Sequence, residues 1–241
     1  MQFNASSPFP DPDGLLLVDK PSGMTSSDVV VAVRRAFRLR KVGHGGTLDP
    51  AATGLLLVLV GKGTRLSGSV MGGDKTYEGT LRLGEATDTQ DAQGVRVSGS
   101  DPSGVTEERL RALIASDFLG DQFQVPPMVS AIKVDGVPLY KRARQGETVA
   151  REPRFIRVES FVVDAFGLPD VRFTVRCSKG TYVRTLCHDI GEKLGCGGHL
   201  AALRRIRSGR FDVRDALPLA DLLALPREAM LARVVPPAAF A

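Results

Sequence analysis

The sequence predicts an α+β fold, because strand-like segments outnumber helix-like ones and the two kinds follow each other irregularly. Short apolar runs and alternating apolar residues, typical of strands, recur along most of the chain. Apolar residues spaced three or four positions apart mark fewer segments, as expected for helices. The chain has no internal repeat and no low-complexity linker, and nothing in it indicates the regular strand–helix alternation of a wound parallel sheet.

Four segments in the first third of the chain show clear patterns. Residues 14–21 (GLLLVDKP) predict a short buried strand that ends at a proline. Residues 25–39 (TSSDVVVAVRRAFRL) predict a helix with hydroxyl residues as N-cap candidates. Residues 55–61 predict a second buried strand, and residues 75–84 alternate, which predicts a third strand with Tyr77 on its apolar face.

The rest of the chain continues the irregular mixture. The expected elements, in chain order, are a capped helix (106–120), a hairpin turn (135–136), a short basic helix (138–146), two alternating strands (154–166 and 171–177), a helix (181–195) and a short helix (219–225). Thr181 is the predicted N-cap of the helix at 181–195.

Basic residues gather in two stretches. Residues 133–157 hold seven Lys or Arg against three Asp or Glu, and residues 199–214 hold five Arg against one Asp. Together these stretches carry +8, and because the whole chain carries +5, the remainder carries −3. Concentrated positive charge is typical of a surface that binds a polyanion. An ordinary solvated face looks the same, so charge alone leaves both interpretations open.

At 241 residues the chain can bury one large core, or one domain with a small appendage. Its longest apolar run, residues 55–60, is too short to cross a membrane. Residues 1–13 lack the basic and apolar parts of a secretory signal, so we expect a disordered lead-in there. Three cysteines without framework spacing indicate reduced thiols in a cytosolic protein.

Several familiar motifs are present only in part. GKGT at 61–64 lacks the earlier glycine of a Walker A loop, because Leu56 stands at that position. The cysteines and histidines between 187 and 199 contain no C-x-x-C pair, so a zinc site is not expected. The loop DTQDAQG has Gln90 where a calcium loop needs a carboxylate. With three histidines and no G-x-S-x-G, a serine hydrolase has little support.

The segment GHGGTLDPAATG (43–54) places a single carboxylate, Asp49, among four glycines. Aspartate before proline is a common turn signal, and taken alone it indicates only a turn. Glycines at this density cost conformational entropy, and they would let a bulky planar ligand approach the backbone. With the two basic stretches, the segment predicts that this ligand is nucleic acid.

Five blocks of sequence carry a family resemblance. In chain order they read LLLVDKPSGMTS, VGHGGTLDPAATGLLLV, KTYEGTLRLGEATDTQDAQG, PPMVSAIKVDG with LYKRARQG, and CSKGTYVRTLCHDIGEKLGCGGHLAALRR. They resemble the bacterial tRNA pseudouridine-55 synthase family, called TruB, and follow its order from about residue 14 to about residue 210. One G-G-x-L-D-P match would be moderate support, whereas five ordered blocks are strong support.

The resemblance implies the pseudouridine-synthase fold, a mixed and mostly antiparallel central sheet flanked by helices. The catalytic domain would span residues 14–215 and include an RNA-gripping insertion at about 125–152. Residues 216–241 are too few for the complete PUA domain that many members carry, so we expect a short tail that packs on the core.

The implied activity is isomerisation of uridine to pseudouridine at position 55, in the T-loop of tRNA, without a metal or an organic cofactor. By resemblance Asp49 is the catalytic carboxylate, acting as a nucleophile at the sugar or as a base, and the sequence leaves both roles open. Arg184 matches the basic residue expected to pair with Asp49. Tyr77 matches the ring that stacks on the target base.

Other positions match substrate-binding residues of the family. His44 is expected to occupy the place of the flipped uridine, and Tyr182 and Leu203 to line the base pocket. Lys20 is expected to support the site and is a candidate phosphate contact. The insertion residues expected to contact the RNA backbone are Lys133, Lys141, Arg142 and Arg144.

The expected partner is the T-arm of tRNA, bound by a cytoplasmic monomer with no membrane contact and no obligate protein partner. Two alternatives remain open: a non-catalytic protein that binds or folds tRNA, and a pseudouridine synthase that acts on another RNA. The joint presence of Asp49, Tyr77 and Arg184 favours the enzyme, because a degenerate binder is expected to have lost at least one of them.

Overall fold

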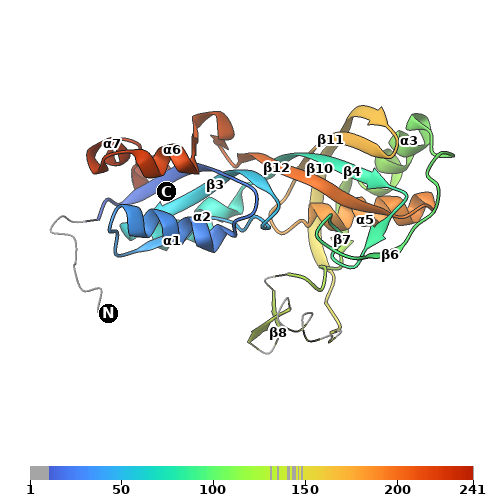
Figure 1. Ribbon diagram of the computed structural model, residues 1–241, viewed down its shortest axis with the longest axis horizontal. Coiled ribbons are helices and arrows are strands. Elements are labelled where there is room, and N and C mark those ends of the chain that lie inside the picture. Colours follow the sequence, from blue (N-terminus) through green and yellow to red (C-terminus); the bar gives the residue numbers. More distant parts are fainter. Residues whose placement is uncertain are drawn as a thin grey trace. The chain divides into compact units, whose positions relative to one another are not determined.

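A computed structural model describes residues 11–130, 132–134, 136–139, 142, 145, 147 and 149–240 (Figure 1). Its contacts divide the chain into two compact units. The first unit combines Met1–Thr76 with Arg204–Ala241, and the second is Tyr77–Leu203. The sequence suggested one domain over 14–215 with a separate tail, whereas the structure groups the tail with the amino-terminal part of the chain. Of the predicted lead-in, only residues 11–13 are described.

The sheet of the first unit follows the strand order β14-β1-β3-β12. Its strands are β1 (Gly14–Lys20), β3 (Thr53–Val60), β12 (Gly198–Ser208) and β14 (Leu217–Pro218), with β2 (Val42–His44) beside β3 and β13 (Phe211–Asp212) beside β12. β1 and β3 pair antiparallel along their length, while β14 joins β1 and β12 joins β3 in parallel. The two apolar runs predicted as buried strands are therefore central strands.

Helices and the tail cover both faces of this sheet. On one face, side chains of β1 and β3 pack against α1 (Ser26–Ala36), α6 (Leu219–Ala224) and α7 (Arg227–Leu231). On the other, they pack against Leu66 of η1 (Gly61–Leu66), Val70 of α2 (Ser67–Gly72) and Phe240. The tail thus completes the core of the first unit, as expected from the sequence.

Helix α1 begins as its sequence predicts. The hydroxyl of Thr25 accepts a hydrogen bond from the Asp28 amide, and the Asp28 carboxylate accepts one from the Thr25 amide. This reciprocal capping box satisfies two amides that the first turn would otherwise leave unpaired. The start of α1 is joined to the end of β1 by the bond from Lys20 to the Met24 carbonyl, and to the segment that carries Asp49 by the bonds between Ser26 and Leu48.

The second unit contains the strand path β12-β4-β11-β10-β7. The new strands are β4 (Lys75–Leu83), β7 (Gly120–Gln124), β10 (Arg154–Gly167) and β11 (Asp170–Cys177). β10 pairs antiparallel with both β11 and β7. With the first unit's ladders, this confirms a mixed, mostly antiparallel sheet flanked by helices. Residues up to Leu203 of β12 belong to this unit, and the strand continues into the first.

The alternation predicted for β4 is confirmed, with Tyr77, Leu81 and Leu83 buried on one face. Gly79 lies on the same face, where an added β-carbon would come within 2.4 Å of the Phe173 ring. Only glycine fits there, because the buried Phe173 ring stacks on Phe161 and has no room to move aside. The core of the second unit is therefore closely packed against β4.

Two helices accompany this sheet, α3 (Glu107–Asp117) and α5 (Val183–Leu194). Thr106 caps α3 by accepting from the Arg109 amide, as predicted. Thr181 does not cap α5, which corrects the prediction. Tyr182 is the N-cap residue and has no side-chain cap, so the helix begins one residue later than predicted. The Tyr182 amide donates to the Gln124 side chain at 2.8 Å.

The remaining elements are short. They are β5 (Ala86–Thr87), β6 (Arg96–Ser98), β8 (Lys133–Val134), β9 (Val137–Pro138), η2 (Val213–Asp215) and η3 (Pro237–Ala239). β8 and β9 pair antiparallel, which confirms a hairpin turn at 135–136. The basic helix predicted at 138–146 lies mostly outside the described residues. Among the residues that are described, no helix is both long and apolar enough to span a membrane.

The contribution of the tail to the core can be measured by truncating Leu222, which is fully buried against β1 and α1. We expect Leu222→Ala to lower the free energy of unfolding by about 2–4 kcal/mol, because it opens a cavity. Leu231→Ala, at an exposed position of the same tail, is expected to cost less than about 0.5 kcal/mol. Urea unfolding of both variants tests this, and equal losses would contradict a packed tail.

Candidate functional site

The segment between β2 and β3 folds into a tight loop that carries Asp49. The Gly45 amide donates to the Leu57 carbonyl at 2.8 Å, which fastens the start of the loop to β3. The Ala52 amide donates to the Asp49 carbonyl at 3.1 Å and closes a turn at its end. The Asp49 side chain is half-buried, so the turn presents the carboxylate partly to solvent.

A buried arginine, Arg205 of β12, donates hydrogen bonds to backbone carbonyls at both ends of this loop. Its Nε donates to the Leu55 carbonyl at 2.7 Å, and its Nη2 and Nη1 donate to the carbonyls of Gly46 at 3.2 Å and Thr47 at 3.4 Å. The side chain is only 1% exposed. An added β-carbon on Gly54 would lie 2.3 Å from the Arg205 carbonyl, so this glycine lets β12 approach β3. The sequence suggested no such role for Arg205.

Lys20, at the end of β1, also donates hydrogen bonds to backbone carbonyls, one of them in the loop. Its ammonium is fully buried and donates to the carbonyls of Pro21 at 2.8 Å, Met24 at 2.6 Å and Pro50 at 3.2 Å. Burial lowers the pKa of Lys20 to about 8, an effect that the nearby Asp49 carboxylate partly offsets. Three carbonyls accept from the ammonium, which is consistent with the expected supporting role of Lys20, and a contact with phosphate stays a prediction.

The first residue of α1 supplies a third attachment. The buried Ser26 hydroxyl accepts from the Leu48 amide at 2.9 Å and donates to the Leu48 carbonyl at 3.2 Å. The residue before Asp49 is thereby tied to the fixed start of the helix. The sequence indicated Ser26 only as one of several cap candidates, because nothing local marks a contact across 22 residues.

His44 ends β2 opposite Val58 of β3, half-buried. Burial and the positive charge of Arg205 lower the pKa of His44, so the ring is neutral at pH 7. Within the described part of the chain its buried Nδ1 atom has no hydrogen-bond partner. A role in replacing a flipped base would therefore rest on the shape of the ring and not on charge, and it stays a prediction.

In the second unit, Arg184 lies in the first turn of α5 and is 4% exposed. Its Nη2 donates to the Val129 carbonyl at 2.6 Å, and its Nη1 lies 3.5 Å from Oδ2 of Asp91. The guanidinium carbon is 5.7 Å from the centroid of the Tyr182 ring. Arg184 is thus a buried cation with a fixed direction, and not the exposed helix residue that its position in sequence would otherwise indicate.

The loop that carries Asp91 is held by its own hydrogen bonds and by one to α5. Oδ1 of Asp91 accepts from the Thr89 hydroxyl at 2.7 Å and from the Gln93 amide at 3.0 Å. Gln90 has a positive φ of 64° and accepts a hydrogen bond from the Thr185 hydroxyl of α5 at 2.7 Å. The segment DTQDAQG, considered from sequence only as a failed calcium loop, therefore holds a carboxylate against Arg184.

The other predicted base-pocket residues also lie in the second unit. Tyr77 is 9% exposed on β4, and Leu203 is half-buried on β12. Gln124 fixes Tyr182 by accepting from its amide and donating to its carbonyl at 3.1 Å. The structure therefore places Tyr77, Tyr182, Arg184 and Leu203 in one unit and His44 and Asp49 in the other, and the predicted Asp49–Arg184 pair stays a prediction.

The predicted RNA-backbone contacts are only partly described. Lys133 contributes its backbone to β8, and Arg142 is half-buried with its guanidinium 4.0 Å from the Glu147 carboxylate. Lys141 and Arg144 lie outside the described residues. Contact of this insertion with RNA consequently stays a prediction.

The arginines of the basic stretch 199–214 differ in their surroundings. Arg205 is buried, and three other arginines form ion pairs. The pairs are Arg204 with Asp19 at 2.6 Å, Arg207 with Asp212 at 3.9 Å and Arg214 with Asp212 at 2.9 Å. Arg205 therefore supports the first unit, whereas the side chains of Arg207 and Arg214 are 54% and 84% exposed, and binding of a polyanion by this stretch stays a prediction. The described residues also contain no group of three or more His, Cys, Asp or Glu placed to hold a metal ion.

Comparison with known proteins extends over nearly the whole chain. The model of the TruB family pseudouridylate synthase N-terminal domain matches residues 34–183, and that of the tRNA pseudouridylate synthase B C-terminal domain matches residues 184–241. A tRNA pseudouridine synthase B of Opitutus terrae is 54% identical over 224 residues, 93% of this chain and 92% of the relative. One of Geobacter sulfurreducens is 51% identical over 223 residues, 92% and 73% respectively.

Among solved structures, the chain matches one in a crystal structure of a Cbf5–Nop10–Gar1 complex with a TM-score of 0.71 and 30% identity. The match covers 92% of this chain and 60% of that one, so this chain spans about three fifths of its length. An archaeal box H/ACA sRNP Nop10–Cbf5 complex gives a TM-score of 0.68 at 28% identity.

The role of Arg205 is testable by Arg205→Lys, which keeps the charge but not the fork that reaches three carbonyls. We expect the free energy of unfolding to fall by about 2–3 kcal/mol, because the buried Leu55 carbonyl and two loop carbonyls lose donors. The amides of Gly45 and Ala52 should also exchange hydrogen faster, as their loop loosens. Arg207→Lys, at a largely exposed position of the same strand, is the control. Unchanged stability and exchange in Arg205→Lys would contradict the assignment.

Proposed function

Since the chain belongs to the TruB family of pseudouridylate synthases, we propose that it isomerises uridine to pseudouridine at position 55, in the T-loop of tRNA. The observation that carries the proposal is the placement of Asp49, a half-buried carboxylate on a loop fixed by the buried cations Lys20 and Arg205. A carboxylate so fixed can act on a sugar carbon without a second nucleophile.

The reaction conserves every atom of the uridine. The N1–C1′ bond breaks, the uracil turns, and C5 forms a new bond to C1′. The proton on C5 then leaves, and N1 gains a proton. A carboxylate can attack C1′, remove a sugar proton or stabilise positive charge at C1′, so one aspartate supplies the chemistry. Lys20 is buried within the unit and interacts electrostatically with Asp49.

We propose that Tyr77 and Arg184 act together with Asp49. The ring of Tyr77 is nearly buried on β4, as expected of a platform that receives an extruded base. Arg184 is oriented by Asp91 and by the Val129 carbonyl, and this orientation would position it for charge stabilisation without a search among rotamers. Tyr182 and Leu203 are proposed to line the base pocket.

Recognition of a T-arm requires that the uridine leave its stack, which costs a few kcal/mol in model systems. The neutral ring of His44 is proposed to fill the vacated place. The insertion at 125–152 is proposed to bind the RNA backbone through Lys133, Lys141, Arg142 and Arg144, which would make affinity depend on salt. A cytoplasmic location and a monomeric state, both predicted from the sequence, are part of the same proposal.

The central test is pseudouridine formation in an unmodified T-arm stem-loop, mapped chemically. Asp49→Asn should lower product formation by a factor on the order of 10³ or more while RNA affinity stays within about threefold, because only the reacting carboxylate is lost. Asp221→Asn, at an exposed position of the same unit, is the matched control. No product from folded wild-type protein, with binding retained, would favour a non-catalytic tRNA-binding protein instead.

A second prediction concerns Asp91 as a positioning residue. Asp91→Asn removes the charge that orients Arg184, so kcat should fall about tenfold while KM changes by less than about threefold. Asp88→Asn makes the same change in the same loop, where Asp88 accepts from the Val95 amide. Steady-state kinetics of the two variants on T-arm RNA separate orientation of Arg184 from loop folding. Equal losses in both would count against the positioning role.

A further inference from the structure

Gln124, the last residue of β7, binds the start of α5 through two hydrogen bonds to one residue. Its Oε1 accepts from the Tyr182 amide at 2.8 Å, and its Nε2 donates to the Tyr182 carbonyl at 3.1 Å. The side chain is 4% exposed, so this contact is part of the core of the second unit. It fixes the backbone two residues before Arg184 from a position 58 residues earlier in the chain.

The first turn of α5 depends on this contact because no side chain caps the helix locally. The Tyr182 carbonyl accepts from the amides of Thr185 at 3.1 Å and Leu186 at 3.2 Å, and these bonds close the turn. The end of a helix frays easily where its backbone has few other partners. Gln124 binds the same carbonyl on which the turn closes. It therefore fixes the position of the turn and resists its opening.

Arg184 lies in this first turn and is itself buried. Its Nη2 donates to the Val129 carbonyl at 2.6 Å, and its Nη1 lies 3.5 Å from Oδ2 of Asp91. Those contacts hold the far end of the side chain, whereas Gln124 holds the backbone from which the side chain begins. The guanidinium has one direction only when both ends are fixed.

Gln124 and Val129 bound one short segment at the start of the insertion. Two consecutive buried prolines, Pro126 and Pro127, lie between them. Each proline ring fixes φ, so this segment has few conformations in which the two residues change their relative positions. The backbone and the side chain of Arg184 are consequently held by a single stiff segment.

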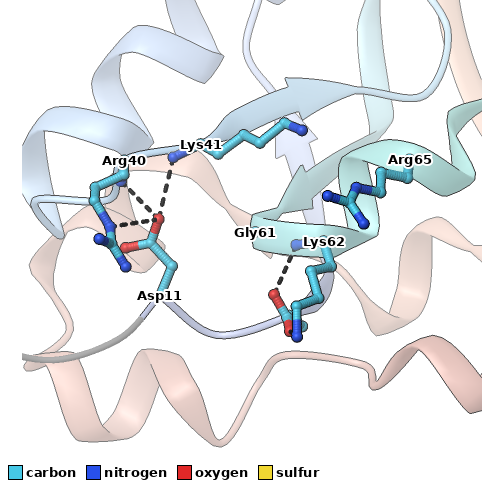
Figure 2. A pocket seen from close by; sticks show the side chains of 7 residues that line it. Asp11, Arg40, Lys41, Gly61, Lys62 and Arg65 are labelled. Atoms are coloured by element: carbon cyan, nitrogen blue, oxygen red, sulfur yellow. Dashed lines mark hydrogen bonds and ion pairs between the residues drawn. The ribbon is translucent and has the colours of Figure 1, made fainter.

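A similar contact in the first unit holds a surface segment. Figure 2 shows Asp11 beside a cavity of about 370 Å³, where its carboxylate accepts from the amides of Arg40 at 2.8 Å and Lys41 at 3.1 Å. The Arg40 side chain there is 67% exposed and can adjust in solvent if its backbone shifts. The backbone that Gln124 holds leads instead to a buried cation. A shift at Gln124 would therefore move a group that has no free space in which to reorient.

We propose that Gln124 is a positioning residue for Arg184, so that the segment from Gln124 to Val129 sets the orientation of this arginine during the reaction. The inference rests on the proposed function, in which Arg184 stabilises charge. A glutamine amide suits the role because it offers one acceptor and one donor side by side and carries no charge. An ionised carboxylate could accept from the Tyr182 amide but would repel its carbonyl, and a cationic side chain could only donate.

The kinetic test compares Gln124→Met with Gln122→Met. Both replace an amide with an unbranched apolar side chain on the same strand and the same face, and Gln122 donates to the Phe118 carbonyl at the end of α3. Gln124→Met should lower kcat on T-arm RNA about 10- to 30-fold with KM within about threefold of wild type, because orientation and not binding is lost. Gln122→Met should change kcat by less than about twofold. Unchanged kcat in folded Gln124→Met, or equal losses in both variants, would overturn the proposal.

Hydrogen exchange measures the same effect without substrate. In Gln124→Met the amides of Tyr182, Thr185 and Leu186 should exchange about fivefold faster or more, because the first turn of α5 opens more often. In Gln122→Met these amides should exchange as in wild type, and unchanged rates in Gln124→Met contradict the proposal.

Should Gln124→Met not fold, Gln124→Asn makes the same comparison with a polar side chain. Asparagine keeps the amide but shortens its reach by one methylene, so kcat should still fall about threefold or more with KM unchanged. Wild-type kcat in folded Gln124→Asn, together with wild-type exchange at the start of α5, would count against the role of Gln124.

A double variant separates orientation of Arg184 from a general loss of stability. Asp91→Asn and Gln124→Met act on the same guanidinium, so their combined loss of kcat should stay within about threefold of the larger single loss. Independent effects would multiply to on the order of 100-fold or more, and that result would contradict action through Arg184. Asp91→Asn with Gln122→Met is the control and should lose no more than Asp91→Asn alone.

Failure of this inference is distinguishable from failure of the proposed function. If the wild type makes pseudouridine and Gln124→Met keeps its kcat, Gln124 is not a positioning residue and the function stands. If the wild type makes no product, the proposed function fails, and the exchange rates alone decide whether Gln124 fixes the turn that carries Arg184.

Discussion

The guanidinium of Arg205 reaches three backbone carbonyls on either side of Asp49, and the geometry of the loop depends on those contacts. Leu55 is fully buried, and leaving its carbonyl without a donor would cost about 1–3 kcal/mol. Arg205 can be there only because β12 meets β3 in parallel beside Gly54, which has no side chain to keep the strands apart. The strand order of the sheet therefore determines where the carboxylate lies.

In both units, a buried cation bonded to backbone carbonyls lies beside a functional residue or is one. In the first, the buried cations Arg205 and Lys20 bind loop carbonyls and leave Asp49 presented at the surface of the loop. In the second, Asp91 and a backbone carbonyl orient a buried Arg184. Taking such charges out of water is expensive, and only a complete set of hydrogen bonds offsets the cost. Rigidity around the functional groups follows, because partial loosening would leave a buried charge without partners.

Periodicity and local capping made much of the fold predictable. The apolar runs of β1 and β3, the alternation of β4 and the Thr25 cap all depend on neighbours in sequence, and all are confirmed. Contacts between distant segments were not predictable in the same way. Arg205 contacts a carbonyl 150 residues away, so a count of charges could not distinguish it from surface arginines. The prediction of Thr181 as the cap was wrong because α5 begins one residue later, with Tyr182 as its N-cap residue and Gln124, 58 residues earlier, bound to the Tyr182 backbone.

The first unit is assembled from both ends of the chain, with the whole second unit encoded between them. During synthesis β1, α1 and β3 leave the ribosome early, but Arg205 and the tail that covers their core do not yet exist. At bacterial elongation rates the intervening residues take on the order of ten seconds to appear. The second unit is continuous and can form in that interval, whereas the Asp49 loop must wait for β12. A ribosome-bound chain is therefore expected to acquire its carboxylate site last.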